Sequence, residues 1–233
     1  MITIDQVVKR RRSRTVLDHV GFEARPGRVT AFLGPNGAGK SSTLRILLGL
    51  DRADSGFALF NGQPYRALPN PLRTVGSMLE GSGAHRSRTA RNHLAWIARS
   101  NGIPQRRIDE VLEEVGLARD AKVRVAKYSL GMGQRLGIAA ALLGEPEMLV
   151  LDEPVNGLDP EGIRWIRGLL RGLAQAGGTV LLSSHLMTEV ADVADDLVVI
   201  AGGRIVTTGT VTDVTAGYAD LEEAFFALTG VTR

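Results

Sequence analysis

Apolar and polar residues alternate over two segments near the start of the chain, as they do in half-buried β-strands. The first predicted strand contains Ile2-Thr3-Ile4 and Val7-Val8, and the second runs from Val16 to Ala24. A third strand is predicted at Phe57–Phe60, because Asn61-Gly62 after it is a pair typical of tight turns. Short strands of this kind indicate a small antiparallel sheet.

The hydrophobic periodicity becomes helical between Thr89 and Leu143. Apolar residues repeat at helical spacing within Leu94–Ala98 and again within Ile108–Val115. Pro104 and Gly116 mark a helix start and a helix stop. The pattern therefore predicts an inserted helical segment.

Beyond this segment, strands alternate with helices in the order that builds a parallel sheet, which predicts an α/β fold. We expect one domain, with its core and antiparallel β subdomain in residues 1–88 and 146–210, a helical subdomain in residues 89–145, and a helical tail in residues 211–233. Within the tail, Asp220–Leu228 is predicted to be a short amphipathic helix. The alternating elements are strand Met148–Asp152, helix Ile163–Gln175, strand Val180–Ser183, helix Leu186–Val193, strand Leu197–Ala201 and short strand Ile205–Thr208.

Composition narrows the class of protein. Among 233 residues, 44% are hydrophobic and 23% are charged, which is typical of a soluble globular protein. Cysteine is absent, which excludes disulfides, thiolate metal sites and a thiol nucleophile and fits a reducing cytoplasm. A net charge of +3 is too small to argue for nucleic-acid binding by itself.

Neither a membrane span nor a signal peptide is expected. The longest apolar stretch, Leu136–Gly144, falls short of the roughly 20 residues that a membrane span needs. The apolar segment Met1–Val8 precedes the first basic residues, whereas a signal peptide has the opposite order. We therefore expect the chain to act at a membrane only through a partner.

The glycine-rich segment GPNGAGKSS fits Gly-x-x-x-x-Gly-Lys-Ser, a loop whose backbone N–H groups surround phosphates. The apolar strand Val29–Leu33 leads into it and the helical run Lys40–Leu48 leads out, so the positive end of a helix points at the phosphates. This context disfavours the alternative of a glycine-rich turn with a chance lysine. The residues expected around the phosphates are Gly34, Pro35, Asn36, Gly37, Ala38, Gly39, Lys40, Ser41 and Ser42.

Two side chains of this loop have separate predicted roles. Lys40, expected to be reachable by solvent, contacts the β- and γ-phosphate oxygens. The Ser41 hydroxyl is expected to ligate Mg²⁺.

An acidic pair ends the apolar strand that begins at Met148. Burying Asp152 and Glu153 unpaired would cost several kcal/mol, and a metal ion removes that cost. Asp152 is therefore expected to hold Mg²⁺, directly or through water, and Glu153 to orient and deprotonate an attacking water. The alternative is that both residues cap the following loop and helix; the phosphate loop earlier in the chain favours catalysis.

The segment Tyr128–Arg135 resembles the signature motif, LSGGQ, of the ATP-binding cassette (ABC) ATPases. Ser129 and Gly131 match its serine and second glycine. Leu130 stands in place of the first glycine, and Met132 stands in place of the glutamine.

Two more segments resemble the same family, so that the likeness extends over residues 2–210. Asn156–Asp159 resembles the D-loop, and His185 stands where the family has its switch histidine. The resemblance implies a P-loop NTPase (RecA-like) parallel-sheet core with a small antiparallel β subdomain and an inserted α-helical subdomain. It also implies that His185 contacts the γ-phosphate and holds the water; a surface or core histidine is the alternative.

The resemblance further implies a head-to-tail dimer of two copies with two ATP molecules between them. A helix that begins at Ser129 can bind a γ-phosphate, yet it lies on the helical insert, so Ser129, Gly131 and Gly133 are expected to meet ATP held by the other copy's loop. Asp159 is expected at the same site. ATP and Mg²⁺ are thus the expected cofactors.

Separate transmembrane permease subunits are the second expected partner. The permease would supply the only membrane contact and place the protein on the cytoplasmic face of the cell membrane. No nucleic acid is expected as a partner.

Two further positions depart from the family pattern. Glu80, the last residue of Val75–Glu80, aligns with the Q-loop glutamine that touches Mg²⁺; a carboxylate can also ligate Mg²⁺ but adds negative charge beside phosphates. Arg11, in the basic run Lys9–Arg14, aligns with an aromatic residue that stacks on adenine, and a guanidinium plane can stack on a base too. A solvated basic turn is an equally good interpretation. Nucleic-acid binding by this run ranks lowest, because no aromatic residues interleave with it.

The resemblance leads to one main functional hypothesis: an ATP-hydrolysing transporter subunit that drives a separate permease. The segments Arg88–Leu94 and Tyr128–Gly137 resemble the corresponding segments of drug, antibiotic and bacteriocin exporters more than those of importers. The expected cargo is therefore drug-like, antibiotic-like or lipid-like. The alternatives are a soluble ABC ATPase with a regulatory, assembly or translation-linked role, and an importer subunit.

Overall fold

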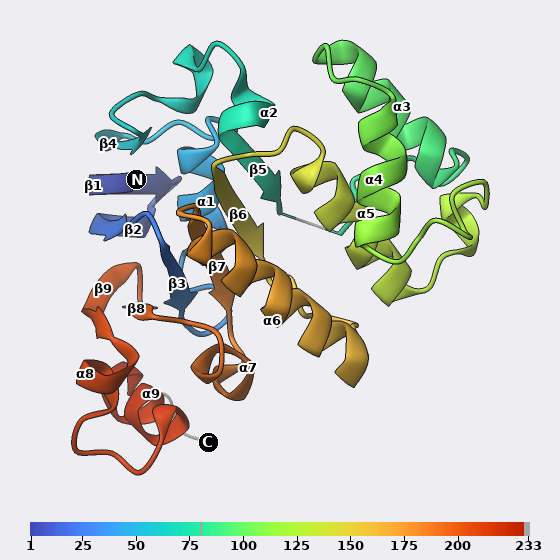
Figure 1. Cartoon of the computed structure of the whole chain (residues 1–233). Helices are drawn as coiled ribbons and strands as arrows, with labels where there is room; N and C mark the ends of the chain where they lie inside the picture. Colours follow the sequence, from blue (N-terminus) through green and yellow to red (C-terminus); the bar gives the residue numbers. More distant parts are fainter. Residues whose placement is uncertain (80, 231–233) are drawn as a thin grey trace. The chain divides into compact units, whose positions relative to one another are not determined.

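The computed structural model describes residues 1–79 and 81–230, and its contacts divide the chain into two units. Unit 1 joins Met1–Leu68 to the chain from Arg167 onward, and unit 2 comprises Pro69–Ile166. The domain boundaries expected from the sequence stay a prediction. Figure 1 labels the elements of both units.

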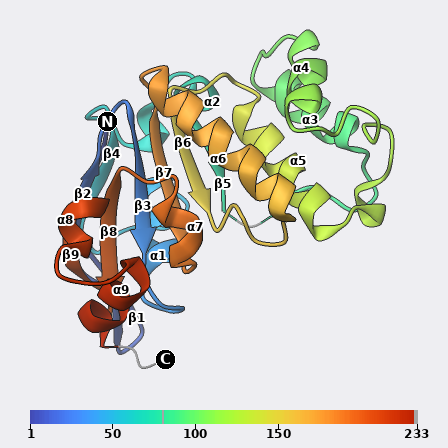
Figure 2. The ribbon, with the colours of Figure 1, turned by 60° about the horizontal axis from the view of Figure 1, so that its bottom comes forward.

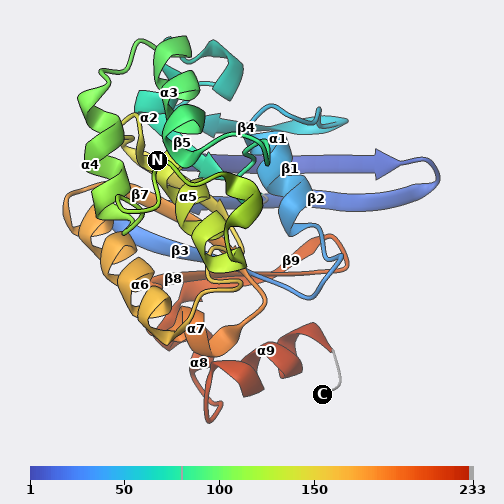
Figure 3. The same cartoon turned by 90° about the vertical axis from the view of Figure 1, so that its right-hand side faces the viewer.

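Unit 1 contains the predicted antiparallel sheet. It consists of β1 (Ile2–Arg11), β2 (Arg14–Ala24) and β4 (Ser55–Phe60), paired in the order β2-β1-β4. Figure 3 shows β1 and β2 as two long neighbouring arrows. Apolar side chains of β1 alternate into the core up to Ile4, and the register then shifts before Val7. This bulge explains why the sequence splits the strand into two apolar pairs.

Four further strands of unit 1 pair in the order β7-β3-β8-β9. β3 (Arg28–Leu33) runs parallel to both β7 (Thr179–Ser184) and β8 (Asp196–Ala201). All residues of β3 after Arg28 are buried, as expected of a strand with neighbours on both sides.

The predicted direction of the last strand was wrong. The sequence pattern placed Ile205–Thr208 in the parallel series, whereas β9 (Arg204–Thr210) pairs antiparallel with β8. Gly202 and Gly203, both with positive φ, reverse the chain between the two strands in a tight hairpin turn, which leaves no room for the crossover that parallel pairing needs.

The helices of unit 1 are short. α1 (Lys40–Leu47) follows β3, and α7 (Met187–Ala191) follows β7. Figure 2 shows α8 (Val211–Thr215) and α9 (Leu221–Thr229) beside β8 and β9. The amphipathic tail is confirmed in α9: Asp220 caps it, and Leu221, Ala224 and Phe225 face the core. A single-turn 3₁₀ helix, Tyr65–Ala67, completes the unit.

Unit 2 contains the predicted helical segment and one pair of strands. β5 (Val75–Met78) runs parallel to β6 (Met148–Asp152). Gly76 of β5 lies directly against the Ala141 carbonyl, with no room for a Cβ. The helices are α2 (Pro71–Thr74), α3 (Ala90–Ser100), α4 (Arg106–Glu114), α5 (Leu130–Leu142) and the 3₁₀ turn Val125–Lys127.

Helix α6 (Pro160–Gln175) contains the boundary between the units. It begins three residues before the predicted start at Ile163. Proline is favoured in the first turn of a helix, where its missing N–H costs nothing. The order of strands and helices otherwise agrees with the predicted α/β fold.

Candidate functional site

The phosphate loop lies between a buried strand and a helix, as predicted. β3 ends at Leu33 and α1 begins at Lys40, with Gly39 as its N-cap at φ 116°. That backbone conformation favours glycine, and a Cβ at this position would also collide with Leu17. Oγ1 of Thr43 donates a 3.0 Å hydrogen bond to the Gly39 carbonyl and holds the first turn of α1 to the loop.

The burial of Lys40 contradicts one expectation. It was expected to be reachable by solvent, but it is only 6% exposed, and its Nζ donates a 2.6 Å hydrogen bond to the Gly34 carbonyl. The lysine folds back into its own loop because the turn brings carbonyl oxygens within reach of the ammonium group. The remaining loop leaves Asn36, Gly37 and Ser41 exposed.

The electrostatics of α1 suit an anion. The first turn has no acidic residue, and its backbone N–H groups carry the positive end of the helix dipole. With Lys40 beside them, these groups can bind phosphate oxygens. The exposed Ser41 hydroxyl offers the oxygen ligand that Mg²⁺ prefers.

His185 lies at the same edge of the unit 1 sheet as the loop. Leu33 of β3 pairs with Ser184 of β7 in parallel register, so Gly34 and His185 each follow the carboxyl end of a neighbouring strand. His185 is half-buried. Ser184 Oγ accepts a 3.0 Å hydrogen bond from the Leu186 N–H and fixes the turn around the histidine.

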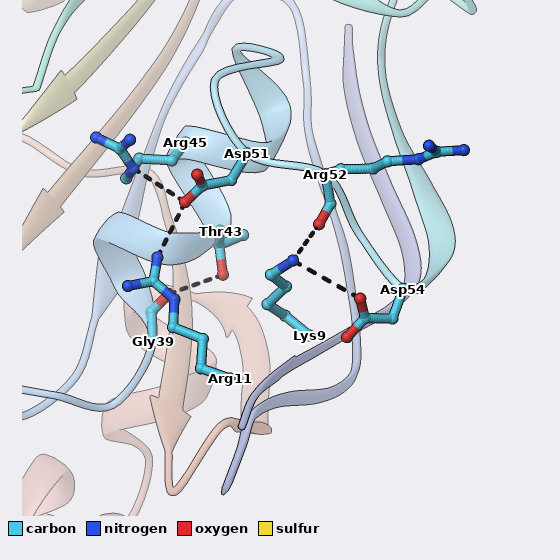
Figure 4. Close-up of polar contacts among 8 residues, drawn as sticks. All are labelled: Lys9, Arg11, Gly39, Thr43, Arg45, Asp51, Arg52 and Asp54. Carbon is cyan, nitrogen blue, oxygen red and sulfur yellow. Dashed lines mark hydrogen bonds and ion pairs between the residues drawn. The ribbon is translucent and has the colours of Figure 1, made fainter. Parts of the chain in front are cut away.

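Arg11 ends β1 and is joined to α1 through an acidic residue that the sequence reading missed. Its Nη2 donates to Asp51 Oδ2 at 3.0 Å, and Nε of Arg45 donates to the same oxygen at 3.0 Å (Figure 4). The Arg45 hydrogen bond holds the pKa of Asp51 below its ordinary value, nearby positive charges add to this, and burial opposes it. The Arg11 side chain is 56% exposed, so its plane remains open to a ligand.

The basic run is held at a second point. Lys9 Nζ donates a 2.6 Å hydrogen bond to the Arg52 carbonyl and lies 3.7 Å from Asp54 Oδ1 (Figure 4). Arg12, at φ 55°, turns the chain between β1 and β2. Part of the run is therefore tied to the loop after α1, while the side chains of Arg10, Arg12 and Arg14 lie exposed.

Unit 2 brings the acidic strand end and the signature segment together. All five residues of β6 are buried, and Asp152 at its end is 6% exposed. Glu153 is half-buried with φ 49°, a conformation uncommon for a residue with a side chain. Its carbonyl accepts a 2.9 Å hydrogen bond from Nε2 of the buried Gln134, a contact that the sequence reading also missed.

The signature segment begins a helix at the predicted residue. Ser129 is the N-cap of α5, and its Oγ accepts a 3.2 Å hydrogen bond from the Met132 N–H. Gly131 and Gly133 lie in the first turn, and the Gly133 N–H donates a 2.9 Å hydrogen bond to the Ser129 carbonyl. The positive end of the helix dipole lies at this turn and favours an anion. Leu130, in place of the family glycine, is 70% exposed.

Asp159 has a structural contact of its own. Its Oδ1 accepts a 2.8 Å hydrogen bond from the Gly162 N–H and caps the start of α6. Asp159 is nevertheless exposed.

The metal ligands are only partly described. Glu80 lies outside the described residues. Among residues 1–79 and 81–230, no cluster of three or more histidine and acidic side chains could hold a metal ion by itself. In unit 1 the Ser41 hydroxyl, and in unit 2 the Asp152 carboxylate, are each of the oxygen type that Mg²⁺ prefers.

Comparison with known families identifies the family of the chain. The family model described as "ABC transporter" matches residues 17–156, more than half of the chain. The chain belongs to the ABC transporter family. As an ABC ATPase it binds ATP and hydrolyses it, and hydrolysis is coupled to transport.

Relatives of this ABC ATPase carry transport functions in their names. The bacitracin transport ATP-binding protein BcrA of Bacillus licheniformis is 42% identical over 208 residues, which are 88% of this chain and 68% of that protein. The lantibiotic transport ATP-binding protein SrtF of Streptococcus pyogenes is 37% identical over 206 residues, 88% of this chain and 89% of that protein. These matches favour a transporter subunit over a soluble regulatory or translation-linked ABC ATPase.

A solved structure shows the same fold. The ATP binding subunit of an ABC transporter matches this ABC ATPase with a TM-score of 0.88 and 28% identity, over 98% of this chain and 99% of that chain. The predicted P-loop NTPase fold is thereby confirmed. Within the part of the chain that the structure describes, every helix is too short or too polar to cross a bilayer.

Proposed function

We propose that this ABC ATPase powers the export of antibiotic-like or lipid-like compounds through a separate membrane permease. The observation that carries the ATP-driven part is the phosphate loop, where Lys40 is folded against Gly34 at the positive end of α1. The cargo class is supported by relatives that are named for transport of bacitracin and of a lantibiotic.

In the proposed site, backbone N–H groups of residues 34–42 surround the phosphates of ATP. Lys40 exchanges its hydrogen bond with the Gly34 carbonyl for the β- and γ-phosphate oxygens, so the lysine is already close to the charge that it neutralises. Its burial strengthens that interaction, because the surrounding dielectric is lower than in water.

We assign the Mg²⁺ ligands to Ser41, Asp152 and Glu80. When bound, the metal neutralises charge on the phosphates during transfer. Asp152 ends the buried strand β6, and its carboxylate oxygens are of the kind that Mg²⁺ prefers, which supports this assignment.

Glu153 is the proposed general base and His185 the residue that holds the γ-phosphate and the water. Glu153 follows β6 directly, and its backbone is fixed by Gln134, which suits a carboxylate that must keep one orientation. His185 follows the strand next to the phosphate loop, within unit 1.

The proposed active form is a head-to-tail pair of two copies. Ser129, Gly131 and Gly133 start a helix whose N-terminus carries no acidic side chain in its first turn, so it can receive a γ-phosphate. Asp159 is exposed and closely follows Gly157, whose carbonyl lies against Gly131, and it would approach the same nucleotide. ATP would then hold the two copies together.

Arg11 is the proposed contact for the nucleotide base. Asp51 restrains the guanidinium from one side, and more than half of the side chain stays exposed for stacking. The other proposed partner is the permease, which would hold this subunit at the cytoplasmic face of the membrane; we assign no nucleic-acid partner.

The proposal is tested by reconstituting the full chain with the permease encoded beside it. ATP hydrolysis should rise when an exported compound such as bacitracin is present on the cytoplasmic side, and the compound should accumulate on the opposite side of the vesicle. Uptake in the reverse direction, or a solute-binding protein in the same gene cluster, would favour the importer. Turnover that is unaffected by the permease would contradict the transport function.

A further inference from the structure

Helix α5 touches the loop between β6 and α6 at two separate points. At the first, Nε2 of Gln134 donates a 2.9 Å hydrogen bond to the carbonyl oxygen of Glu153. Gln134 is 5% exposed, so this bond is shielded from competing water. When a buried amide donates a hydrogen bond to one particular carbonyl, it fixes the orientation of that peptide group.

The peptide group that it fixes is an unusual one. Glu153 has φ 49°, the left-handed region that residues with a Cβ rarely adopt. Such a conformation persists only where surrounding contacts hold it. Besides Gln134, the Asn156 N–H donates to the same carbonyl at 3.3 Å as part of the turn. The hydrogen bond from α5 is thus the shorter of these two restraints on the residue that carries the proposed base.

The second point of contact lies at the other end of the same turn. Gly157 has φ 77°, and the space that a Cβ would need there is filled by the side chain of Leu130. A Cβ on Gly131 would lie 2.9 Å from the Gly157 carbonyl, so the two backbones also approach closely. The first turn of α5 therefore abuts Gly157 while its second turn holds Glu153.

We infer that Gln134 is a positioning residue that aims the Glu153 carboxylate and ties it to the helix that begins at Ser129. The inference rests on the proposed function of Glu153 as the base. Because backbone dihedrals set the direction of the Cβ, a peptide held by Gln134 also holds the direction of the carboxylate. A shift of α5 when its N-terminus meets a phosphate would be passed to Glu153 through the same bond, and Leu130 would move Gly157 with it.

The experiment compares Gln134→Met with Gln134→His in the full chain, supplied with ATP and Mg²⁺. Methionine fills the space but donates nothing, whereas histidine keeps a ring N–H at a similar reach. Gln134→Met should lower kcat by about 10- to 100-fold, the size of effect expected from misaiming a catalytic group. Binding of a non-hydrolysable ATP analogue should stay within about twofold of the native value, and Gln134→His should recover most of kcat.

The matched control is Gln105→Met, the same change at an exposed position of unit 2. If Gln134→Met does not fold, Gln134→Glu, which keeps the size but lacks the amide donor, is judged by the same two measurements.

Three results overturn the inference. The first is a kcat of Gln134→Met equal to that of the control. The second is a parallel loss of analogue binding and thermal stability in Gln134→Met, which would mean a purely structural role, and the third is no recovery of kcat in Gln134→His. Failure of the proposed function is distinguishable, because it would appear as normal turnover in Glu153→Gln. An inactive Glu153→Gln beside a fully active Gln134→Met would contradict only the role of Gln134.

Discussion

The ammonium group of Lys40 donates a 2.6 Å hydrogen bond to the Gly34 carbonyl, six residues before it in the same loop. This bond closes the phosphate loop on itself and keeps a positive charge within it. The lysine is therefore both part of the loop's structure and its proposed ligand for phosphate.

Lys40→Ala should lose ATP hydrolysis while the chain stays folded. The change removes a charged hydrogen bond, which contributes about 1.5–3 kcal/mol, but it also relieves the desolvation of a buried ammonium, so the two effects largely cancel in the free energy of unfolding. Phosphate release and the thermal melt are the measurements, with exposed Lys122→Ala as the control. Near-native turnover with a native melt would contradict the assignment of this loop.

Asp51 should make the free energy of unfolding depend on pH in the acidic range. Its pKa is lowered in the folded chain, mainly by the hydrogen bond from Arg45, so the stabilisation is complete above its ordinary value of 3.8 and is lost as pH falls through the lower folded value. Asp51→Asn should therefore melt earlier than the native chain at pH 7, and this difference should shrink by pH 3. A constant difference across that range would show that the ion pairs contribute nothing.

Arg11→Ala should weaken ATP binding by several-fold and leave kcat at saturating ATP nearly unchanged, because base stacking acts on the bound nucleotide at all stages of the reaction. Arg14→Ala, an exposed arginine in the neighbouring strand, is the matched control. Equal ATP affinity in the two variants would support the solvated basic turn instead.

Glu80→Gln should preserve or raise ATP hydrolysis and flatten its dependence on Mg²⁺ and on acidic pH. In the proposed site, the substitution would remove a negative charge beside the phosphates and keep an oxygen ligand. The test is a pair of Mg²⁺ and pH profiles for the variant and the native chain. Superimposable profiles would show that residue 80 is not at the metal.

Much of the fold could be predicted because it is encoded in local patterns. The strand at β6 matches its apolar run residue for residue, and Ser129 caps a helix because its hydroxyl can accept a hydrogen bond from the Met132 N–H. The start of α6 was missed by three residues, although Asp159-Pro160 is a good signal: an N-cap acceptor followed by a proline in the first turn. The reversal at Gly202-Gly203 was also visible in the sequence as a tight-turn pair.

Other parts of the site could not be predicted, because they depend on contacts between distant residues. No pattern near Lys40 in the sequence predicts that its ammonium group donates to the Gly34 carbonyl instead of facing solvent. The partners of Arg11 and of Glu153 are separated from them along the chain, and no periodicity links Asp51 or Gln134 to those positions. Such contacts require the three-dimensional arrangement of β1 with α1 and of β6 with α5.

The most direct test of the central claim, a composite ATP site between two copies, is the molecular mass of Glu153→Gln measured by light scattering. Losing the base should cut turnover by on the order of 10²–10⁴ and leave ATP trapped, so the variant should be a dimer with ATP and a monomer with ADP. Glu147→Gln, an exposed acid in the same unit, should behave like the native chain. Adding Ser129→Arg should abolish the dimer, because a bulky cation would fill the helix N-terminus meant for the γ-phosphate. A Glu153→Gln chain that stays monomeric at saturating ATP, even beside its permease, would contradict the composite site.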